Sequence, residues 1–500
     1  MNRALKRLSL AVLVMFLLLL VNINYLQGFE ANSLADKPGN IRAINAQYQN
    51  QRGKIVTADG TVIAESVATA KGSSIPWQRR YPVPYVYAPV TGYDTLYSAT
   101  GIEKYENSTL NGNSSSLDVH NFIDLITGKK QQGATVTVTV NSAAQEAAYK
   151  GLQSALQGTG RTGGVVALDP ATGAILAMAS FPSYDPNLLA VLDGKTLNSN
   201  DTKLQLEPGK PLINHAINDL YPPGSTFKIV TSSAYFNANP TSTVQTKLYS
   251  PTNLTLPQTS NTLINDDNEV CGDGSGQVAL IDAFAQSCDT TFGKIGLNLG
   301  GGALNTAAEA YGFNNKNLTV PMPVSPSAYS IAPQGSPLVA YSAIGQFDDL
   351  ASPLQEAMLA AAIADGGKLM TPYLVQSVTA SDLSPISSAT PTTLGQAVPG
   401  NVATEIGQMM EAVVQQPNGT AYSFNANAEG GLNIAGKTGT AQNGVSNGRT
   451  ADAVFTCFAP YGNPKIAVGV IIQGGGYGAT AAAPIAVQVI KAYLKTLGIG

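Results

Sequence analysis

The N-terminal segment combines a basic start with one long apolar run. Arg3, Lys6 and Arg7 precede residues 8–26, which carry only scattered polar side chains. About twenty apolar residues in a helix span the hydrocarbon core of a bilayer, and basic flanks stay on the cytoplasmic side. We therefore predict one uncleaved membrane anchor, a cytoplasmic N-terminus and an exported remainder. A cleaved secretory signal is the alternative, but the run is long for a signal core and shows no small-residue cleavage site.

The rest of the chain changes character near residue 134. Residues 31–133 are polar and irregular, with short strand-like runs such as residues 54–57 before an Asp-Gly turn signal. Residues 134–140 then alternate as a half-buried strand does. Downstream patterns predict a helix over 143–156, a β-hairpin over 163–179, strands over 451–459 and 465–473, and a helix over 483–495. Strands near both ends of this segment indicate one sheet built from distant pieces of chain, with helices packed on it.

Composition excludes several classes of function. The 500-residue chain has 28 basic and 32 acidic residues, a net charge of −4, and so lacks the basic excess of a nucleic-acid binder. Its two histidines and three cysteines lie at spacings that match no zinc-ligand pattern, and we predict no metal and no cofactor. A Ser-His-Asp hydrolase would have to use His120 or His215, and neither lies in a partner motif.

The three cysteines are interpreted through the predicted export, which permits disulfides. Cys271 and Cys288 are 17 residues apart, whereas Cys457 lies in the apolar run 454–458. We predict a Cys271–Cys288 disulfide, which stabilises by roughly 3 kcal/mol in the chain-entropy model, and a buried free thiol at Cys457. Three reduced thiols are the alternative.

The sharpest motif is Tyr-Pro-Pro-Gly-Ser-Thr-Phe-Lys over residues 221–228. It places Ser225 and Lys228 three positions apart at the start of an expected helix, and therefore on one face. A serine hydroxyl needs an adjacent base, and a lysine amine can serve when burial and neighbouring cations lower its pKa. The helix N-terminus adds partial positive charge where an oxyanion would form. Alone the pattern is weak, because a capping serine and an exposed lysine produce it as well.

Two further motifs give this pattern its weight. Gly-Lys-Thr-Gly-Thr-Ala over residues 436–441 can present a cation and a hydroxyl to a substrate carboxylate while its backbone pairs with an extended peptide. Ser-Cys-Asp over residues 287–289 lies between the two. Ser-x-x-Lys, then Ser-x-Asn or a similar triplet, then Lys-Thr-Gly, is the signature of penicillin-binding proteins and serine β-lactamases. The three in this order are much more specific than any one alone.

The resemblance covers most of the chain, roughly residues 40–495. The sequence resembles class B penicillin-binding proteins, which are D,D-transpeptidases, and looks most like the actinobacterial penicillin-binding protein A group. Its Ser-Cys-Asp triplet, extra cysteine and short N-terminal module carry the likeness to that group. Other family-like stretches are Arg52-Gly53-Lys54-Ile55, Asp59-Gly60, Gly101-Ile102-Glu103, Asp185-Pro186-Asn187, Asn214-His215-Ala216, Ala343-Ile344-Gly345-Gln346 and Pro353-Leu354-Gln355.

The resemblance implies an α+β fold. Its transpeptidase domain would hold an antiparallel five-stranded sheet flanked by helices plus an all-helical subdomain. A small, mostly β N-terminal module and one transmembrane helix would precede it. The implied division is a cytoplasmic tail over 1–7, an anchor over 8–27, a non-catalytic pedestal or dimerisation-like domain over 28–140, and the transpeptidase domain over 141–500.

The resemblance also assigns the reaction. Ser225 would attack the penultimate D-Ala carbonyl of a peptidoglycan stem peptide and release the terminal D-Ala. Lys228 would take the serine proton, and Ser287 would relay a proton toward the leaving amine. An amine of a neighbouring stem would then attack the acyl-enzyme and form a cross-link, and β-lactams would inhibit by acylating the same serine.

Substrate binding is implied at the third motif. Lys437 and Thr438, with Gly439 and Thr440, would hold the terminal carboxylate. The backbone N–H groups of Ser225 and Thr440 would form the oxyanion hole. The segment before the catalytic domain is too short for a glycosyltransferase, so glycan polymerisation would belong to a membrane or divisome partner.

Two positions depart from the family pattern. Asp289 stands where most of the superfamily has Asn, and a carboxylate near Lys228 would favour the ammonium form. Asp289 would therefore point away, be protonated, or be offset by Lys437. His215 stands where relatives often have Arg, and we interpret it as a structural residue near the site.

Other functions share parts of this pattern. A membrane-anchored β-lactamase would need a deacylating base, and no counterpart of the class A glutamate is recognisable. A β-lactam sensor would need further transmembrane helices. A non-catalytic divisome scaffold acting through residues 31–133 is the alternative from a different class, although intact motifs argue against it as the sole role.

Overall fold

The computed structural model describes residues 3–28, 30, 48–73, 75–117, 126, 130–442 and 450–499. Helix α1 (Arg3–Gly28) contains the stretch Leu5–Gln27, whose mean hydropathy is 2.3 and none of which is buried in the protein. Its 26 residues exceed the roughly 20 needed to cross a bilayer, which confirms the predicted N-terminal apolar helix. His120 and much of the predicted N-terminal domain, such as residues 31–47, lie outside the described residues.

A five-stranded antiparallel sheet forms the centre of the larger domain. Its order is β15 (Ala435–Ala441), β16 (Asp452–Ala459), β17 (Ile466–Ile472), β5 (Gly163–Leu168) and β6 (Ile175–Phe181). Every residue of β16 and β17 is buried, as expected for continuous apolar runs of strand length. The prediction of one sheet made from distant pieces of chain is confirmed, and β15 and β6 are its two edge strands.

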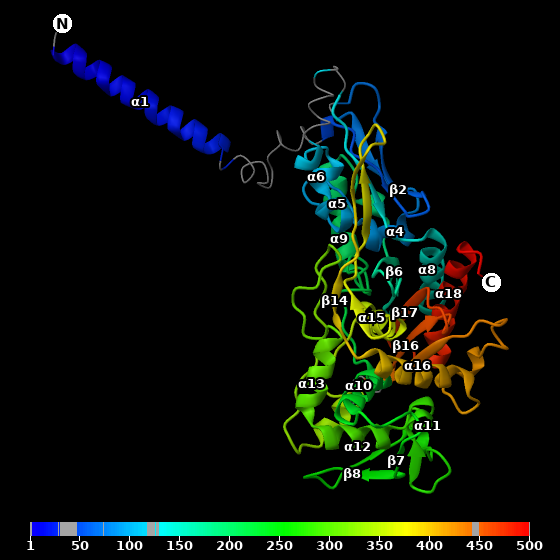
Figure 1. Ribbon diagram of the computed structural model, residues 1–500. Coiled ribbons are helices and arrows are strands. Elements are labelled where there is room, and N and C mark those ends of the chain that lie inside the picture. The colour runs from blue at the N-terminus through cyan, green and yellow to red at the C-terminus, as the bar shows by residue number, and fades with distance from the viewer. Residues whose placement is uncertain are drawn as a thin grey trace.

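Helices cover both faces of this sheet. Helices α8 (Ser142–Leu156) and α18 (Ala483–Thr496) pack together on one face, while α15 (Pro353–Ala364) crosses the other face (Figure 1). A Cβ at Gly469 of β17 would lie 2.4 Å from the Pro353 oxygen, so glycine at this position allows α15 to approach the strands closely. Helix α16 (Gly400–Gln415) packs beside α15 and against β15.

The other half of the larger domain is mainly helical. It contains α10 (Lys228–Ala238), α11 (Leu280–Ala285), α12 (Asp289–Leu299), α13 (Gly301–Ala310) and α14 (Leu338–Ser342). The all-helical expectation needs correction, because two antiparallel ladders also lie here: β7 (Lys247–Tyr249) with β10 (Gln277–Ala279), and β8 (Asn253–Thr255) with β9 (Thr262–Ile264). Each strand is three residues long, too short for alternation to be recognised in the sequence.

The N-terminal module is a mixed sheet with short helices. The strand order is β13 (Pro385–Ser388), β12 (Val375–Thr379), β4 (Thr135–Val138), β1 (Ile55–Val56), β2 (Val62–Ala68) and β3 (Trp77–Arg80). The β12–β13 hairpin comes from far along the chain, so segments on both sides of residue 140 share this sheet. The short helices of this module are α4 (Pro84–Thr91), α5 (Gly101–Tyr105) and α6 (Asn107–Leu110). Elsewhere in the chain, α9 (Gly194–Leu206) follows β6, α17 (Gly478–Ala481) packs against β16 and α18, and β11 (Lys368–Met370) pairs with β14 (Thr393–Gln396).

A buried ion cluster holds this module together. The fully buried Glu103 accepts from Arg52 Nε through one oxygen and from Arg79 Nε through the other, both at 2.6 Å. Asp94 lies 3.8 Å from Arg52, and Tyr81 donates to Glu103 at 3.2 Å. The two arginines lower the pKa of Glu103 against the effect of burial, whereas burial raises the pKa of Asp94 to about 6 despite Arg52.

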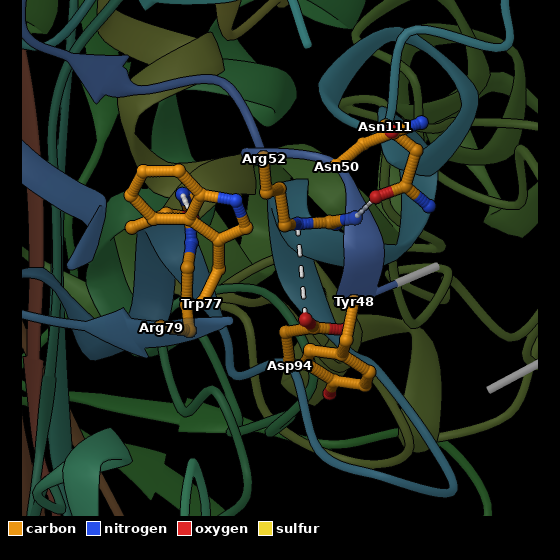
Figure 2. Close-up of a pocket in the computed structure, with 8 residues that line it drawn as sticks. Tyr48, Asn50, Arg52, Trp77, Arg79, Asp94 and Asn111 are labelled. Carbon is orange, nitrogen blue, oxygen red and sulfur yellow. Dashed lines mark hydrogen bonds and ion pairs between the residues drawn. The ribbon is translucent and has the colours of Figure 1, made fainter. Parts of the chain in front are cut away.

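The cluster encloses a small cavity (Figure 2). Trp77 and Arg79 lie along one side of it, and Tyr48 and Asp94 lie on another. Its volume is about 10 Å³, which is about the space that one water molecule needs. Arg52 runs between the two sides and is held by both charged and neutral acceptors, so the cavity lies within a structural network.

Candidate active site

The predicted nucleophile lies on a tight turn against the edge of the main sheet. Ser225 is half-buried in the 3₁₀ turn η3 (Gly224–Phe227), which leads directly into α10. Gly224 has φ +57°, and a Cβ there would lie 3.0 Å from the Thr440 oxygen of β15. Gly345, which also has positive φ, backs the same turn and accepts a hydrogen bond from the Gly224 N–H at 2.9 Å. Glycines in the left-handed region therefore allow the turn to lie against β15.

Lys228 is the first residue of α10 and is fully buried. Its Nζ lies 2.7 Å from the Ser287 carbonyl oxygen, 3.1 Å from Ser287 Oγ and 2.6 Å from Asp289 Oδ1. The ring of Phe292 lies 5.5 Å from the same nitrogen. Three arrangements were considered for Asp289. The one in which it points away from Lys228 is wrong, because the carboxylate contacts the amine directly.

Ser287 reaches Lys228 because of an unusual backbone conformation between α11 and α12. Its φ is +62°, a region that residues with a side chain seldom adopt and that is common at functional sites. This conformation brings both the carbonyl and the hydroxyl of one residue to Lys228. The next residue, Cys288, forms the predicted disulfide with Cys271, and Cys457 is a buried free thiol as predicted.

Lys437 approaches the same serine hydroxyl from β15. Its buried Nζ donates to Ser287 Oγ at 2.9 Å and to the Thr438 carbonyl at 3.0 Å, and lies 5.7 Å from the Phe284 ring. Thr438 Oγ1 lies 2.6 Å from Thr420 Oγ1. One hydroxyl, that of Ser287, therefore connects the two lysines of motifs that are far apart in the sequence.

The electrostatics of the site follow from two buried cations and one nearby carboxylate. Burial lowers the pKa of Lys228, Asp289 acts in the opposite direction, and burial prevails. Burial and the charge of Lys228 hold the pKa of Lys437 well below the ordinary lysine value. A lysine amine that loses its proton easily can accept one from a serine hydroxyl.

The edge position of β15 gives the site a wall that can bind an extended peptide. β15 pairs with β16 on one side, and its other side faces the Ser225 turn. Thr440 is half-buried there, and Gly439 lies so close to the Pro223 oxygen that a Cβ would be 2.7 Å from it. Backbone groups at an exposed sheet edge can bind an added strand, which suits a peptide substrate.

His215 lies beside β6, at the opposite edge of the main sheet from β15, where its N–H donates to Ser180 Oγ at 2.9 Å. Its Nδ1 lies 2.6 Å from Asp219 Oδ2, which also accepts from the Tyr221 hydroxyl at 3.1 Å. The N–H of Tyr221, the first residue of the motif, donates to the Ala351 carbonyl. His215 is therefore connected to the start of the nucleophile turn through Asp219 and Tyr221.

Several residues of the site lie outside the motifs that predicted it. Phe284 and Phe292 place aromatic rings beside the two lysines, and Thr420 contacts Thr438. Glu356 contacts the residue that follows Ser225. None of these residues belongs to a short motif. Only Glu356, an acidic residue within an otherwise apolar helix, gave a signal that could have been recognised in the sequence.

Comparisons with known proteins agree with this geometry. A model of the penicillin binding protein transpeptidase domain matches residues 163–491, and one of the penicillin binding protein A dimerisation domain matches residues 52–136. Over 505 residues the chain is 40% identical to the peptidoglycan D,D-transpeptidase PbpA of Mycolicibacterium smegmatis and 38% identical to that of Mycobacterium tuberculosis, with 99% of each chain covered.

Solved structures show the same similarity in three dimensions. The ceftriaxone acyl-enzyme complex of penicillin-binding protein A from M. tuberculosis superposes with a TM-score of 0.84 at 36% identity, covering 90% of this chain and 100% of that chain. The penicillin G acyl-enzyme complex of that protein gives 0.82 at 37% identity, covering 89% and 100%.

Proposed function

This chain belongs to the penicillin-binding protein transpeptidase family, in its class B, and on that premise we propose that Ser225 is the acylating nucleophile. The chain is a peptidoglycan D,D-transpeptidase of cell wall synthesis, and β-lactams are covalent inhibitors of such enzymes. The observation that carries the assignment of residues is the position of Ser287 Oγ, 3.1 Å from Lys228 Nζ and 2.9 Å from Lys437 Nζ.

The proposed first step forms an acyl-enzyme. Ser225 Oγ attacks the carbonyl carbon of the penultimate D-Ala, and its proton passes to the Lys228 amine. The negative charge on the carbonyl oxygen is stabilised by the N–H groups of Ser225 and Thr440. The bond to the nitrogen of the terminal D-Ala then breaks, and the proton reaches that nitrogen through Ser287.

The proposed second step transfers the acyl group. The neutral amine of a neighbouring stem peptide attacks the carbonyl carbon of the Ser225 ester and gives one proton to Lys228. The new amide forms as the bond between that carbon and Ser225 Oγ breaks, and the serine oxygen takes the proton from Lys228. Lys437, Thr438, Gly439 and Thr440 hold the donor carboxylate during the first step. Asp289 stabilises the positive charge on Lys228 each time that lysine is protonated.

We extend the proposal to the whole chain. Residues 1–7 form a cytoplasmic tail, residues 8–27 the anchor, residues 28–140 a non-catalytic pedestal, and residues 141–500 the extracytoplasmic catalytic domain. The one N-terminal apolar helix supports a single-pass anchor, and the basic residues before it support the orientation. A membrane glycosyltransferase would supply the glycan strands.

Intact-mass spectrometry tests the nucleophile. The chain from residue 31 onward is incubated with penicillin, and we expect a persistent adduct that maps to Ser225 and is absent from Ser225→Ala. An adduct that disappears within seconds while penicilloate accumulates would indicate a β-lactamase. Correctly folded protein that forms no adduct would overturn the catalytic proposal and favour a scaffold.

A further inference from the structure

Helix α15 carries one charged side chain in the middle of the core. Its sequence is Pro-Leu-Gln-Glu-Ala-Met-Leu-Ala-Ala-Ala-Ile-Ala, and Glu356 is fully buried. A buried carboxyl is costly unless it is neutral or well paired. Among the described residues Glu356 has no cationic partner, and its Oε2 has no hydrogen-bond partner. The mechanism above gives this carboxyl no role.

Glu356 contacts the turn that carries the nucleophile. Its Oε1 lies 3.0 Å from the Oγ1 of Thr226, the residue after Ser225. The same Oγ1 lies 2.8 Å from the carbonyl oxygen of Pro223, two residues before Ser225. A single side-chain atom therefore connects the buried carboxyl to the backbone on the far side of the nucleophile.

Proton counting fixes the direction of these two contacts. A hydroxyl has one hydrogen to donate, and a carbonyl oxygen can only accept. If Thr226 donates to Pro223, the contact with Glu356 is a hydrogen bond only when Glu356 is protonated and donates. If Glu356 is ionised, Thr226 must donate to the carboxylate, and the hydrogen bond from Thr226 Oγ1 to the Pro223 carbonyl is lost.

The surroundings of Glu356 favour the neutral acid. The side chain faces Thr226 from η3, its own backbone oxygen accepts from Thr456 of β16, and Gly469 of β17 packs against its Cβ. Lys228 and Lys437 make their hydrogen bonds to Ser287, Asp289 and Thr438 instead. Burial raises the pKa of Glu356 to about 8, and the Thr226 contact offsets part of that rise.

We propose that Glu356 is a positioning residue, which as a neutral acid donates to Thr226 and thereby holds the Pro223–Phe227 turn with Ser225 in its reactive position. The inference rests on the proposed role of Ser225. Ionisation of Glu356 has two consequences. It reverses the Thr226 hydrogen bond, and it places a negative charge beneath a site where negative charge develops on the acyl oxygen.

The test is the pH dependence of acylation by a fluorescent penicillin, measured on the full-length protein in detergent from about pH 6 to about pH 9.5. In the wild type the acylation rate constant should decline as pH rises through about 8. Glu356→Gln keeps a donor but cannot ionise, so it should acylate at a near wild-type rate at neutral pH and lose the decline. Glu356→Met has no donor and should acylate about fivefold more slowly at neutral pH.

Two further sets of variants separate positioning from general damage. Asp349→Asn changes another buried carboxyl, one whose hydrogen bond goes to Ser342 and not to the nucleophile turn, so the alkaline decline should remain. Thr226→Val should reproduce the loss seen in Glu356→Met, Thr226→Ser should acylate several-fold faster than Thr226→Val, and the Glu356→Met/Thr226→Val double variant should lose no more than either single variant.

The outcomes separate the two proposals. A wild type that acylates, together with an unchanged alkaline decline in Glu356→Gln, would overturn the role of Glu356 and leave Ser225 in place. Independent, multiplicative losses in the double variant would also overturn it. A folded wild type that forms no adduct at any pH would overturn the role of Ser225, and the inference with it.

Discussion

The two buried ionic clusters of this protein use opposite charge balances. In the N-terminal module, Arg52 and Arg79 meet two carboxylates, and both oxygens of Glu103 are paired at 2.6 Å. In the candidate active site, Lys228 and Lys437 share the Ser287 hydroxyl, and one carboxylate, that of Asp289, contacts Lys228. The first cluster is balanced and the second is short of negative charge.

The choice of cation follows the same division. Arginine stays protonated in proteins and binds carboxylates through a planar fork, whereas a buried lysine readily shifts its pKa. Accordingly, the pKa of Arg52 is raised above its ordinary value and that of Lys228 is lowered below its own. The difference supports a structural role for the balanced cluster and the proposed role of Lys228 as a base in the unbalanced one.

The largest effect is expected from removal of the base. Lys228→Ala should lower the rate constant of Ser225 acylation by up to ~10⁴-fold, the range of general acid–base catalysis. Stopped-flow mixing with a reporter β-lactam measures it. The exposed Lys203→Ala serves as the control, and a wild-type rate in Lys228→Ala would remove the basis for the comparison.

Breaking the balanced cluster should reduce stability and leave acylation intact. Glu103→Gln keeps the shape but removes the carboxylate that both arginines contact, and breaking a buried pair typically costs about 3–5 kcal/mol. Trp77 is the only tryptophan of the chain and lines the cluster, so its fluorescence during urea unfolding reports this loss. A large fall in the acylation rate of the folded variant would show that the two regions are not separate in function.

Removal of the Cys271–Cys288 disulfide is expected to have an intermediate effect, on both stability and acylation. Replacing both Cys271 and Cys288 with serine should lower the free energy of unfolding by roughly 3 kcal/mol for a loop of this length. Because Cys288 follows Ser287 directly, acylation should also slow. Calorimetry and acylation kinetics on the same sample measure both effects, and an unchanged stability with and without reductant would contradict the prediction.

The smallest effect is expected at Asp289, the carboxylate that contacts Lys228. Asp289→Asn should keep the acylation rate within about tenfold, or about 1.4 kcal/mol. Asp289 raises the pKa of Lys228, so its removal should move the acid limb of acylation to lower pH. A rate profile against pH measures this shift, and complete loss of acylation would refute a merely modulating role.

The sequence predicted what is local or carried by motifs. Apolar runs predicted strands β16 and β17, and three short motifs in order predicted residues of the candidate active site. The pairing of β12 with β4 could not be predicted, because the partners Val378 and Val136 are separated by nearly half of the chain. Long-range strand pairing leaves no signal in the local pattern of either strand.

The arrangement of the side chains in the candidate active site could not be predicted from the sequence either. The residue type at position 289 left three arrangements open, and only the fold places Asp289 2.6 Å from Lys228. The positive φ of Ser287 and the rings of Phe284 and Phe292 likewise depend on how α11 and α12 meet. The orientation and burial of a side chain, which decide its pKa, depend on packing and not on the local sequence.

The proposed role of Lys228 as the base is tested most directly by the acid limb of the pH profile of wild-type acylation. The rate constant for acylation of Ser225 by a reporter β-lactam is measured from about pH 5 upward. The rate should rise with pH around an apparent pKa below the ordinary lysine value of 10.5, because burial favours the neutral Lys228 amine. A limb centred near 10.5, as for a lysine in water, would contradict it.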